Sequence, residues 1–204
     1  MFTGIIRYQG VVIVSETHDT FSSLCLKVPP ELFRTLSIGS SVAVNGVCLT
    51  VVSMNDGVIA FDLIPETLQR TVLSDLVVGD FVHIEASLCF GDEVGGHFLS
   101  GHVFGIGVIT EIRGRSYFVR VGRDVIKYLF EKGFVAIDGV SLTVVQVDTK
   151  ERIFQIDLIP ETLRATLLGN KISGSRVNIE IDFMTQSAVD TVLRFLKTHS
   201  DMIL

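Results

Sequence analysis

The chain has no tryptophan and little cysteine, with three cysteines among its 204 residues. Cys25, Cys48 and Cys89 cannot all pair with one another, and none of them belongs to a Cys-x-x-Cys motif. A secreted fold built on disulfides is therefore not expected. The first residues, MFTGIIRYQG, also lack the basic start and the long apolar core of a signal peptide. Together these absences predict a reduced, cytoplasmic protein.

Other missing features each exclude a class of function. The net charge is −6 and lysines and arginines do not cluster, which argues against a nucleic-acid-binding surface. No apolar run reaches the roughly 18 residues that a membrane-spanning helix needs. The chain has no GxSxG, P-loop or GxGxxG motif, and its histidines, cysteines and acidic residues do not follow metal-ligand spacing.

The chain does contain an internal duplication. The sequence DLIPETL begins at Asp62 and again at Asp157, and VNGVCLTVV from Val44 aligns with IDGVSLTVV from Ile137. Two further pairs of segments align in the same order, namely Gly4-Ile5-Ile6 with Gly101-His102-Val103 and residues 79–85 with residues 174–180. The copies lie about 95 residues apart, which is too long a period for a solenoid. We expect two domains of one fold, 1–90 and 91–184, that meet near the Gly-containing stretch CFGDEVGG.

Each repeat contains six short segments rich in apolar and β-branched residues, which predict β-strands. In the first repeat these cover residues 10–14, 22–28, 41–45, 47–52, 58–64 and 81–86. In the second they cover residues 105–110, 116–121, 134–138, 140–147, 153–159 and 176–182. Six strands can close a small barrel, which leaves no exposed sheet edge. Segments that open with proline, at Pro29 and Pro65, predict short helices.

The last segment, residues 185–204, belongs to neither repeat and is expected to form a helix. Its apolar residues follow helical spacing and form one stripe of Val189, Val192, Leu193 and Leu196. Ser187 followed by Asp190 resembles a capped helix start. The helix has to bury its stripe, either on its own barrels or on another subunit.

The repeated DLIPETL motif allows two interpretations. Pro65 and Pro160 could end a strand and start a helix in a turn that the fold requires, with no ligand involved. Against this, Glu66-Thr67 and Glu161-Thr162 are the same in both copies although the flanking residues differ. The identity of these polar residues favours a binding function.

A second repeated motif places pairs of polar side chains on one face of a strand. Cys48 and Thr50 lie two residues apart, as do Ser141 and Thr143, so each pair points in one direction. If that direction is inward, these groups need hydrogen-bond partners. A polar ligand would supply such partners, and so would the backbone.

The histidines distinguish the two repeats. His102 stands where the first repeat has Ile5, and His97 has no counterpart there. Because an imidazole titrates near neutral pH, His102 is the preferred acid–base candidate, whereas His97 is expected to hold its loop. The remaining histidines belong to no motif and are expected on the surface or in packing, namely His18, His83 and His199.

The motifs taken together resemble the riboflavin synthases of the alpha type. The resemblance lies, in this order, in MFTGII, NGVCLTV, FDLIPETL, GGHFLSGH, KGFVAIDGVSLTV, IDLIPETLRATLLG and RVNIEID, and it covers nearly the whole chain. It implies a mainly β fold of two tandem six-stranded Greek-key barrels followed by a C-terminal helix. Each barrel would bind one molecule of 6,7-dimethyl-8-ribityllumazine.

The resemblance further implies a transferase that catalyses the last step of riboflavin biosynthesis. A four-carbon unit would pass from one lumazine to the other, giving riboflavin and 5-amino-6-ribitylamino-pyrimidinedione, with no metal or redox cofactor. The family is trimeric, with the first barrel of one subunit facing the second barrel of a neighbour, and the C-terminal helix would help to assemble the trimer. The sequence does not decide whether the chain associates with lumazine synthase.

The resemblance also carries binding residues onto this sequence. On the first barrel it assigns Gly4, Ile5, Ile6, Cys48, Leu49, Thr50, Asp62, Leu63, Ile64, Pro65, Glu66 and Thr67. On the second barrel it assigns Gly101, His102, Val103, Lys132, Ser141, Leu142, Thr143, Asp157, Leu158, Ile159, Pro160, Glu161 and Thr162. Phe2 is expected to pack on a ligand ring.

The chemistry needs one group that removes a proton from the acidic 7-methyl of one lumazine and another that attacks C7 of the second molecule. His102, Ser41 and Cys48 are the candidates for these steps. Ser141, Thr143 and Asp182 are supporting candidates on the second barrel, and Asp182 has the alternative role of capping the helix that follows it.

Other classes of protein are weighed against this one. A non-catalytic relative, such as the lumazine-binding antenna proteins of luminous bacteria, keeps the fold but has a degraded second site, whereas both motif copies are intact here. A barrel domain of the flavoprotein reductases lacks the tandem repeat. A structural protein without a ligand would carry apolar residues at the positions of Cys48, Thr50, Ser141 and Thr143.

Overall fold

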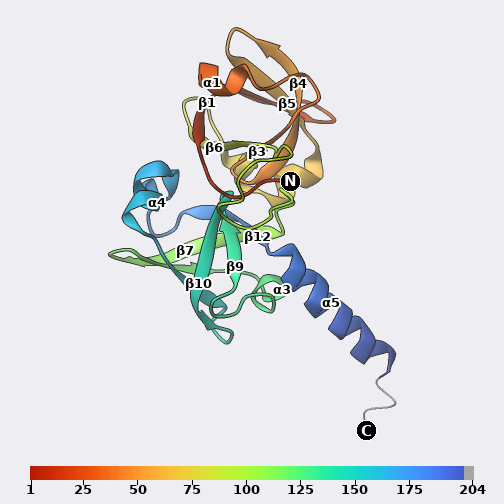
Figure 1. The fold of residues 1–204 in the computed structure, drawn as a ribbon, viewed down its shortest axis with the longest axis vertical. Helices are drawn as coiled ribbons and strands as arrows, with labels where there is room; N and C mark the ends of the chain where they lie inside the picture. The colour runs from red at the N-terminus through yellow and green to blue at the C-terminus, as the bar shows by residue number, and fades with distance from the viewer. Residues whose placement is uncertain (200–204) are drawn as a thin grey trace.

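The computed structural model describes residues 1–199, and two β-barrels make up most of it (Figure 1). The first barrel closes six antiparallel strands in the order β1-β2-β5-β4-β3-β6. Its strands are β1 (Tyr8–Thr17), β2 (Ser22–Lys27), β3 (Ser41–Val44), β4 (Val47–Asn55), β5 (Val58–Leu63) and β6 (Phe81–Ala86). Short helices α1 (Pro30–Phe33) and α2 (Pro65–Arg70) and the 3-10 turn η1 (Val72–Asp75) join them.

The second barrel repeats this arrangement, with the order β10-β11-β8-β7-β12-β9, which is the same cyclic order. Its strands are β7 (Gly105–Arg113), β8 (Ser116–Arg120), β9 (Phe134–Ile137), β10 (Val140–Asp148), β11 (Ile153–Asp157) and β12 (Arg176–Ile181). The connections are helices α3 (Arg123–Ile126) and α4 (Pro160–Ala165) and the 3-10 turn η2 (Leu167–Asn170). The expected pair of six-stranded barrels is confirmed.

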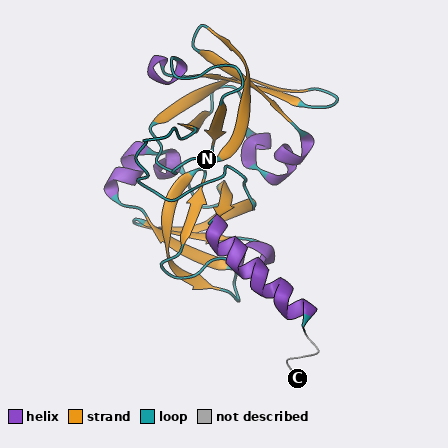
Figure 2. Cartoon of the chain, turned by 45° about the vertical axis from the view of Figure 1, so that its right-hand side comes forward, coloured by secondary structure: helices purple, strands orange, loops and turns teal. Residues whose placement is uncertain are grey.

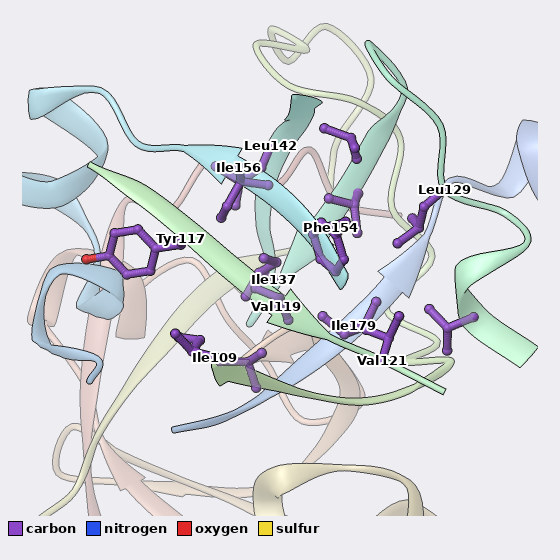
Figure 3. Close-up of a cluster of buried hydrophobic side chains, with 14 of the residues drawn as sticks. Ile109, Tyr117, Val119, Val121, Leu129, Ile137, Leu142, Phe154, Ile156 and Ile179 are labelled. Atoms are coloured by element: carbon purple, nitrogen blue, oxygen red, sulfur yellow. The ribbon is translucent and has the colours of Figure 1, made fainter. Parts of the chain in front are cut away.

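Each barrel encloses its own hydrophobic core. Alternate residues of each strand point inward, as the strand period of two requires, so that Leu49 on β4 and Leu142 on β10 are buried. Figure 3 shows the second core, where Phe154, Ile156 and Val119 converge from neighbouring strands. Because each repeat fills its own barrel, the duplication predicted from sequence corresponds to two separately packed units.

A smaller contact joins the barrels, and the N-terminal segment runs through it (Figure 2). Phe2 and Leu99 exchange backbone hydrogen bonds of 2.8 and 3.0 Å and pack with two alanines, Ala43 and Ala136. The Asn-Gly turn before β4 meets the Asp-Gly turn before β10. A Cβ atom on Gly46 would lie 2.7 Å from the backbone nitrogen of Gly139. Equivalent residues of the two repeats therefore face each other across an approximate two-fold axis.

His83 and Asn178 occupy equivalent positions on β6 and β12, and each binds the backbone of the other barrel. Asn178 donates from Nδ2 to the carbonyl of Asn45 and accepts at Oδ1 from the backbone N–H of Val72, both at 2.8 Å. His83 accepts at Nε2 from the N–H of Leu167 at 2.6 Å, and its Nδ1 lies 2.8 Å from the carbonyl oxygen of Asp138. The Leu167 donor requires an unprotonated Nε2, so Nδ1 carries the proton.

This geometry predicts a stability that depends on pH. His83 is 1% exposed, and burial lowers its pKa, an effect that Asp138 opposes and Lys171 reinforces. Protonation would turn Nε2 into a second donor facing the N–H of Leu167. Because the pKa of His83 is lower in the folded than in the unfolded state, its neutral form contributes fully to stability above the unfolded pKa of about 6.5. This contribution is lost as the pH falls below that value.

The variant His83→Asn copies the arrangement at Asn178 without a titrating group. Between the unfolded and folded pKa values, the wild-type free energy of unfolding should fall by about 1.4 kcal/mol per pH unit more than that of the variant. Urea unfolding at about pH 7.5 and about pH 5.5 measures the difference. Equal slopes for the two proteins would show that His83 does not govern this dependence.

The C-terminal helix α5 spans Phe183–Thr198 and extends away from the second barrel (Figure 1). It begins four residues before the expected start at Ser187, because the carboxylate of Asp182 accepts a hydrogen bond from the N–H of Thr185 at 2.8 Å and caps it. Its first half is attached by Val189, which packs on the second core, and by Asp190, which accepts a 2.6 Å hydrogen bond from the Tyr128 hydroxyl.

The outer half of α5 carries apolar side chains that are exposed in the described part of the chain, including Val192, Phe195 and Leu196. Of the expected helical segment, residues 200–204 lie outside the described residues. Within residues 1–199, no helix combines the length and the apolar character that crossing a bilayer requires.

Candidate functional site

The repeated polar pairs lie on the outer faces of the barrels. On β4 and β10 the leucine between each pair is buried, whereas Thr50 and Thr143 are exposed and Cys48 and Ser141 are half-buried. The condition under which these groups would need internal partners, an inward-facing strand surface, is therefore not met. They are instead available to a ligand bound against the outside of each barrel.

Each of these surfaces is completed by a loop of the other repeat, namely residues 101–103 on the first barrel and residues 4–6 on the second. The backbone N–H of Cys48 donates to the carbonyl of Gly101 at 2.9 Å, and the N–H of Ser141 donates to the carbonyl of Gly4 at 2.9 Å. Val103 packs against the first core and Ile6 packs against the second. This corrects the expected grouping, in which Gly4–Ile6 would serve the first barrel and Gly101–Val103 the second.

We define the first-barrel site as Ser41, Cys48, Thr50, 62–67 and 101–103. We define the second-barrel site as Ser141, Thr143, Lys132, His97, 157–162 and 4–6. Strand register brings the DLIPETL segments to these surfaces. Val51 pairs with Phe61 in antiparallel register, so the next residues, Thr50 and Asp62, lie beside each other. In the same way the pairing of Val144 with Ile156 sets Thr143 beside Asp157.

Each DLIPETL motif turns from a strand into a short helix. Ile64 and Ile159 are extended at the N-cap, and the proline that follows occupies the first helical turn, where its missing N–H costs nothing. Glu66 and Glu161 are exposed and pair with Arg70 and Arg164 on the same helix. The first leucine of each motif, Leu63 or Leu158, is buried, so only its backbone can face a ligand.

The second-barrel site holds a close His–Ser pair that the sequence analysis did not identify. His97 Nδ1 lies 2.6 Å from the Ser141 hydroxyl oxygen, and the imidazole stacks on Phe134 with ring centroids 5.0 Å apart. His97 is 6% exposed, and burial lowers its pKa although Asp182 acts in the opposite direction. The imidazole is therefore neutral at neutral pH and suited to exchange a proton with Ser141.

His97 also lines a pocket beside this pair. Among buried side-chain nitrogen and oxygen atoms of residues 1–199, Nε2 of His97 is the one without a hydrogen-bond partner. The pocket that His97 lines measures about 420 Å³, and its lining also includes Lys132, Phe130, Asp182 and Met184. An unpaired buried polar atom costs free energy, so a polar ligand at this position would be stabilised.

Lys132 reaches this pocket from a strained backbone. Its φ is 66°, in the left-handed region, at the position where the first repeat has Gly39 with a φ of 90°. A lysine in this conformation costs on the order of 1 kcal/mol relative to glycine. Asp182, the other charged residue of the pocket, is engaged as the N-cap of α5, which was the alternative role considered for it.

The first-barrel site is more open. Ser41 on β3 pairs in register with Thr50 on β4, and His102 is exposed beside Gly101, whose carbonyl accepts from Cys48. The His102 N–H donates to the Ser100 hydroxyl at 3.2 Å. The structure thus brings Ser41, Cys48, Thr50 and the His102 loop to one surface, and Ser141, Lys132 and Asp182 to another.

The structure overturns one expectation about an individual residue and makes another more specific. Phe2, expected to pack on a ligand ring, is 1% exposed and fills the contact between the barrels with Leu99. His83, expected on the surface or in packing, is buried in the same interface and makes backbone contacts across it. Its equivalence to Asn178 in the aligned segments 79–85 and 174–180 was the signal that could have identified it.

Comparison with known proteins shows similarity over nearly the whole chain. The lumazine binding domain family matches residues 3–87 and again residues 100–182. The chain is 50% identical to the riboflavin synthase of Chlamydia pneumoniae over 96% of its own length and 97% of that protein. It is 44% identical to the riboflavin synthase of Escherichia coli over 98% of its length and 96% of that protein.

A solved structure shares the fold. The crystal structure of LumP complexed with riboflavin superposes with a TM-score of 0.80 at 26% identity, covering 89% of this chain and 99% of that one. The family match spans both barrels, and the similarity to the two riboflavin synthases covers 96% and 98% of the chain. The chain therefore belongs to the riboflavin synthase family.

Proposed function

We propose that the protein converts two molecules of 6,7-dimethyl-8-ribityllumazine into riboflavin and 5-amino-6-ribitylamino-pyrimidinedione by transfer of a four-carbon unit. The observation that carries this proposal is the pair of equivalent outer surfaces, one on each barrel, that the same duplicated motifs build. A reaction between two copies of one molecule requires two sites for that molecule. The identity to riboflavin synthases over the whole chain supports the same conclusion.

The two sites would act mainly by positioning. Holding two lumazines in reacting geometry turns a bimolecular encounter into an effectively unimolecular step, which can account for about 7–11 kcal/mol of barrier lowering. Backbone groups of the segments 62–67 and 157–162 suit the pyrimidine edge of each molecule. The hydroxyls of Thr50, Thr67, Thr143 and Thr162 suit ring and ribityl oxygens.

The second-barrel site would supply the activated hydroxyl. The neutral imidazole of His97, 2.6 Å from Ser141, can accept the Ser141 proton as the oxygen, or a water bound beside it, attacks C7 of one lumazine. The ammonium of Lys132 in the adjoining pocket would stabilise negative charge that develops on a ring held there. His97 thereby joins the candidates for catalysis.

The first-barrel site would handle the proton of the 7-methyl group. Loss of this proton gives an anion that is delocalised into the lumazine ring, so a weak base at close range is sufficient. His102 is the acid–base candidate, with Cys48 and Ser41 beside it on the same surface. The two sites thus differ in kind: one has an exposed imidazole and a thiol, and the other has a buried imidazole paired with a hydroxyl.

We also propose that the chain forms a homotrimer through α5, with facing barrels of neighbouring subunits completing each reaction centre. The uncovered apolar residues Val192, Leu193, Phe195 and Leu196 support packing of this helix on another subunit. Exposed apolar groups of this size are usually covered in an assembly. The three free cysteines support a reducing, cytoplasmic setting for the enzyme.

Truncation after Thr185 tests the role of α5, since it removes the helical stripe and leaves both barrels. We expect the truncated protein to sediment as a monomer and the full chain as a trimer. The substitution Lys197→Ala, on the same helix but outside the apolar stripe, should leave the trimer intact. A truncated protein that still sediments as a trimer would exclude the helix as the assembly element.

Turnover of the lumazine tests the proposed function. The purified protein is mixed with 6,7-dimethyl-8-ribityllumazine, without added metal or nucleotide, and the absorbance of riboflavin is followed with time. We expect riboflavin to form at a rate proportional to protein concentration. Tight binding of the lumazine without riboflavin formation would contradict the proposal and favour a non-catalytic lumazine-binding protein.

A further inference from the structure

Glu180 is a buried acidic residue that the proposed chemistry does not use. It lies near the end of β12, is 4% exposed, and has no lysine or arginine within ion-pair distance among the described residues. Its counterpart Glu85 lies on β6 and is half-buried. A buried carboxylate without a cation is costly to keep, so its hydrogen-bond partners indicate what it contributes.

Glu180 holds the loop that leads to His102. Its carboxylate accepts hydrogen bonds from the N–H of Ser100 at 2.7 Å, the Ser100 hydroxyl at 2.8 Å and the N–H of Gly101 at 3.1 Å. The Ser100 hydroxyl in turn accepts from the N–H of His102 at 3.2 Å. Glu180 therefore fixes three consecutive residues, ending at the acid–base candidate.

The same loop is fixed against Cys48 on the other barrel. The carbonyl of Gly101 accepts from the N–H of Cys48 at 2.9 Å, and a Cβ atom on Gly101 would lie 2.5 Å from the Cys48 Cβ. Contact this close leaves little freedom between the loop and β4. A side chain of the second barrel thus sets the geometry of a site on the first barrel.

Glu85 makes the equivalent contacts to the loop of residues 3–4. It accepts from the N–H of Thr3 at 2.6 Å, the Thr3 hydroxyl at 2.8 Å and the N–H of Gly4 at 3.0 Å, and the carbonyl of Gly4 accepts from the N–H of Ser141 at 2.9 Å. Thr3 and Ser100 are equivalent, as are Gly4 and Gly101. The acidic residue of each barrel is therefore connected to the site on the opposite barrel.

We propose that Glu180 is a positioning residue of the reaction, which sets the separation of His102 and Cys48 in the first-barrel site, and that Glu85 does the same for the loop beside Ser141. The inference rests on the proposed function, because it assigns His102 and Cys48 to a reaction centre. A displacement of about 1 Å in reacting groups can cost about 10²-fold in rate, so residues that touch no substrate can control turnover.

The variant Glu180→Gln keeps the size of the side chain but presents an amide NH₂ group where the carboxylate accepts from the loop. We expect kcat to fall about 10²-fold with a much smaller change in KM, in a protein whose circular dichroism is that of the wild type. Glu111→Gln changes a glutamate on β7 outside both sites and should retain the wild-type kcat and KM. Full kcat in folded Glu180→Gln would overturn the proposal.

A second readout distinguishes a displaced Gly101 loop from a general loosening of the protein structure. In a Cys25→Ser/Cys89→Ser background Cys48 is the single thiol, and its rate of reaction with a thiol reagent reports how closely Gly101 covers it. We expect Glu180→Gln to speed this reaction about tenfold and Glu85→Gln to leave it unchanged, because Glu85 holds the other loop. Equal acceleration by both variants would contradict the proposal.

Two further outcomes are decisive. If Glu180→Gln does not fold, Ser100→Ala replaces it. This variant keeps the carboxylate but removes one donor to Glu180 and the acceptor for the His102 N–H. An unchanged kcat of Ser100→Ala would then overturn the proposal. If the wild type forms no riboflavin, the proposed function fails, but the Cys48 comparison between Glu180→Gln and Glu85→Gln still supports or overturns the positioning of the loop.

Discussion

Replacing His97 by asparagine lowers kcat for riboflavin formation by about 10²–10⁴-fold, the range expected when a positioned proton-transfer group is lost. The reason is the 2.6 Å contact between His97 Nδ1 and the Ser141 hydroxyl, in which burial keeps the imidazole neutral. Asparagine can still hold the loop but cannot accept the Ser141 proton. Because the proton transfer takes place in the transition state, kcat should fall much more than KM changes. Steady-state rates with 6,7-dimethyl-8-ribityllumazine measure both.

The control for this variant is Lys150→Ala, which changes an exposed residue in the turn between β10 and β11, outside both sites. It should retain the wild-type rate. If His97 and Ser141 act as one unit, Ser141→Ala should be as slow as His97→Asn, and the double variant should be no slower than either. Full activity of Ser141→Ala together with a slow His97→Asn would contradict the pairing.

Replacing Gly101 by alanine destabilises the protein by about 2–5 kcal/mol and removes most of the activity. The backbone φ of Gly101 is 79°, and an added Cβ would lie 2.5 Å from the Cβ of Cys48 and 2.9 Å from the ring of Phe2. A left-handed alanine costs about 1–2 kcal/mol and overpacking about 1–3 kcal/mol more. The clash also separates the His102 loop from Cys48. Urea unfolding and steady-state rates measure the two effects.

Gly114→Ala separates backbone strain from crowding. Gly114 also has a positive φ, 61°, but nothing lies within 4 Å of the position of its Cβ. The Gly114→Ala protein should therefore lose only about 1–2 kcal/mol of stability and keep its activity. Equal losses for Gly101→Ala and Gly114→Ala would show that the tight contact with Cys48 contributes nothing.

The barrels could be predicted from the sequence because their signals are local. Strand periodicity in each repeat marks the twelve strands now observed, and the aligned motifs show that one fold occurs twice. The spacing of Ser187 and Asp190 predicts a helix start that is four residues too late, because the N-cap of α5 in the tertiary structure is Asp182. A carboxylate at the end of a strand can be a cap or a catalytic group, and the pattern does not separate the two.

The arrangement of the sites could not be predicted in the same way. Aligned repeats show that Gly4–Ile6 and Gly101–Val103 are equivalent, but not that each loop crosses to the other barrel. The contact of His97 with Ser141 joins residues far apart in sequence and depends on this crossing. Glu85 and Glu180 align in the two repeats, yet the positioning role proposed for them follows only from the loop N–H groups that the fold brings to their carboxylates.

The central claim is that each barrel holds one lumazine-type ligand, which would explain why the chain is duplicated. Calorimetric titration of the full-length protein with riboflavin, the proposed product, tests it most directly because no turnover intervenes. The account predicts two molecules bound per chain with unequal affinities, since the two sites differ in their histidines. Binding of one molecule per chain would contradict it, because a single site cannot bring two lumazines together.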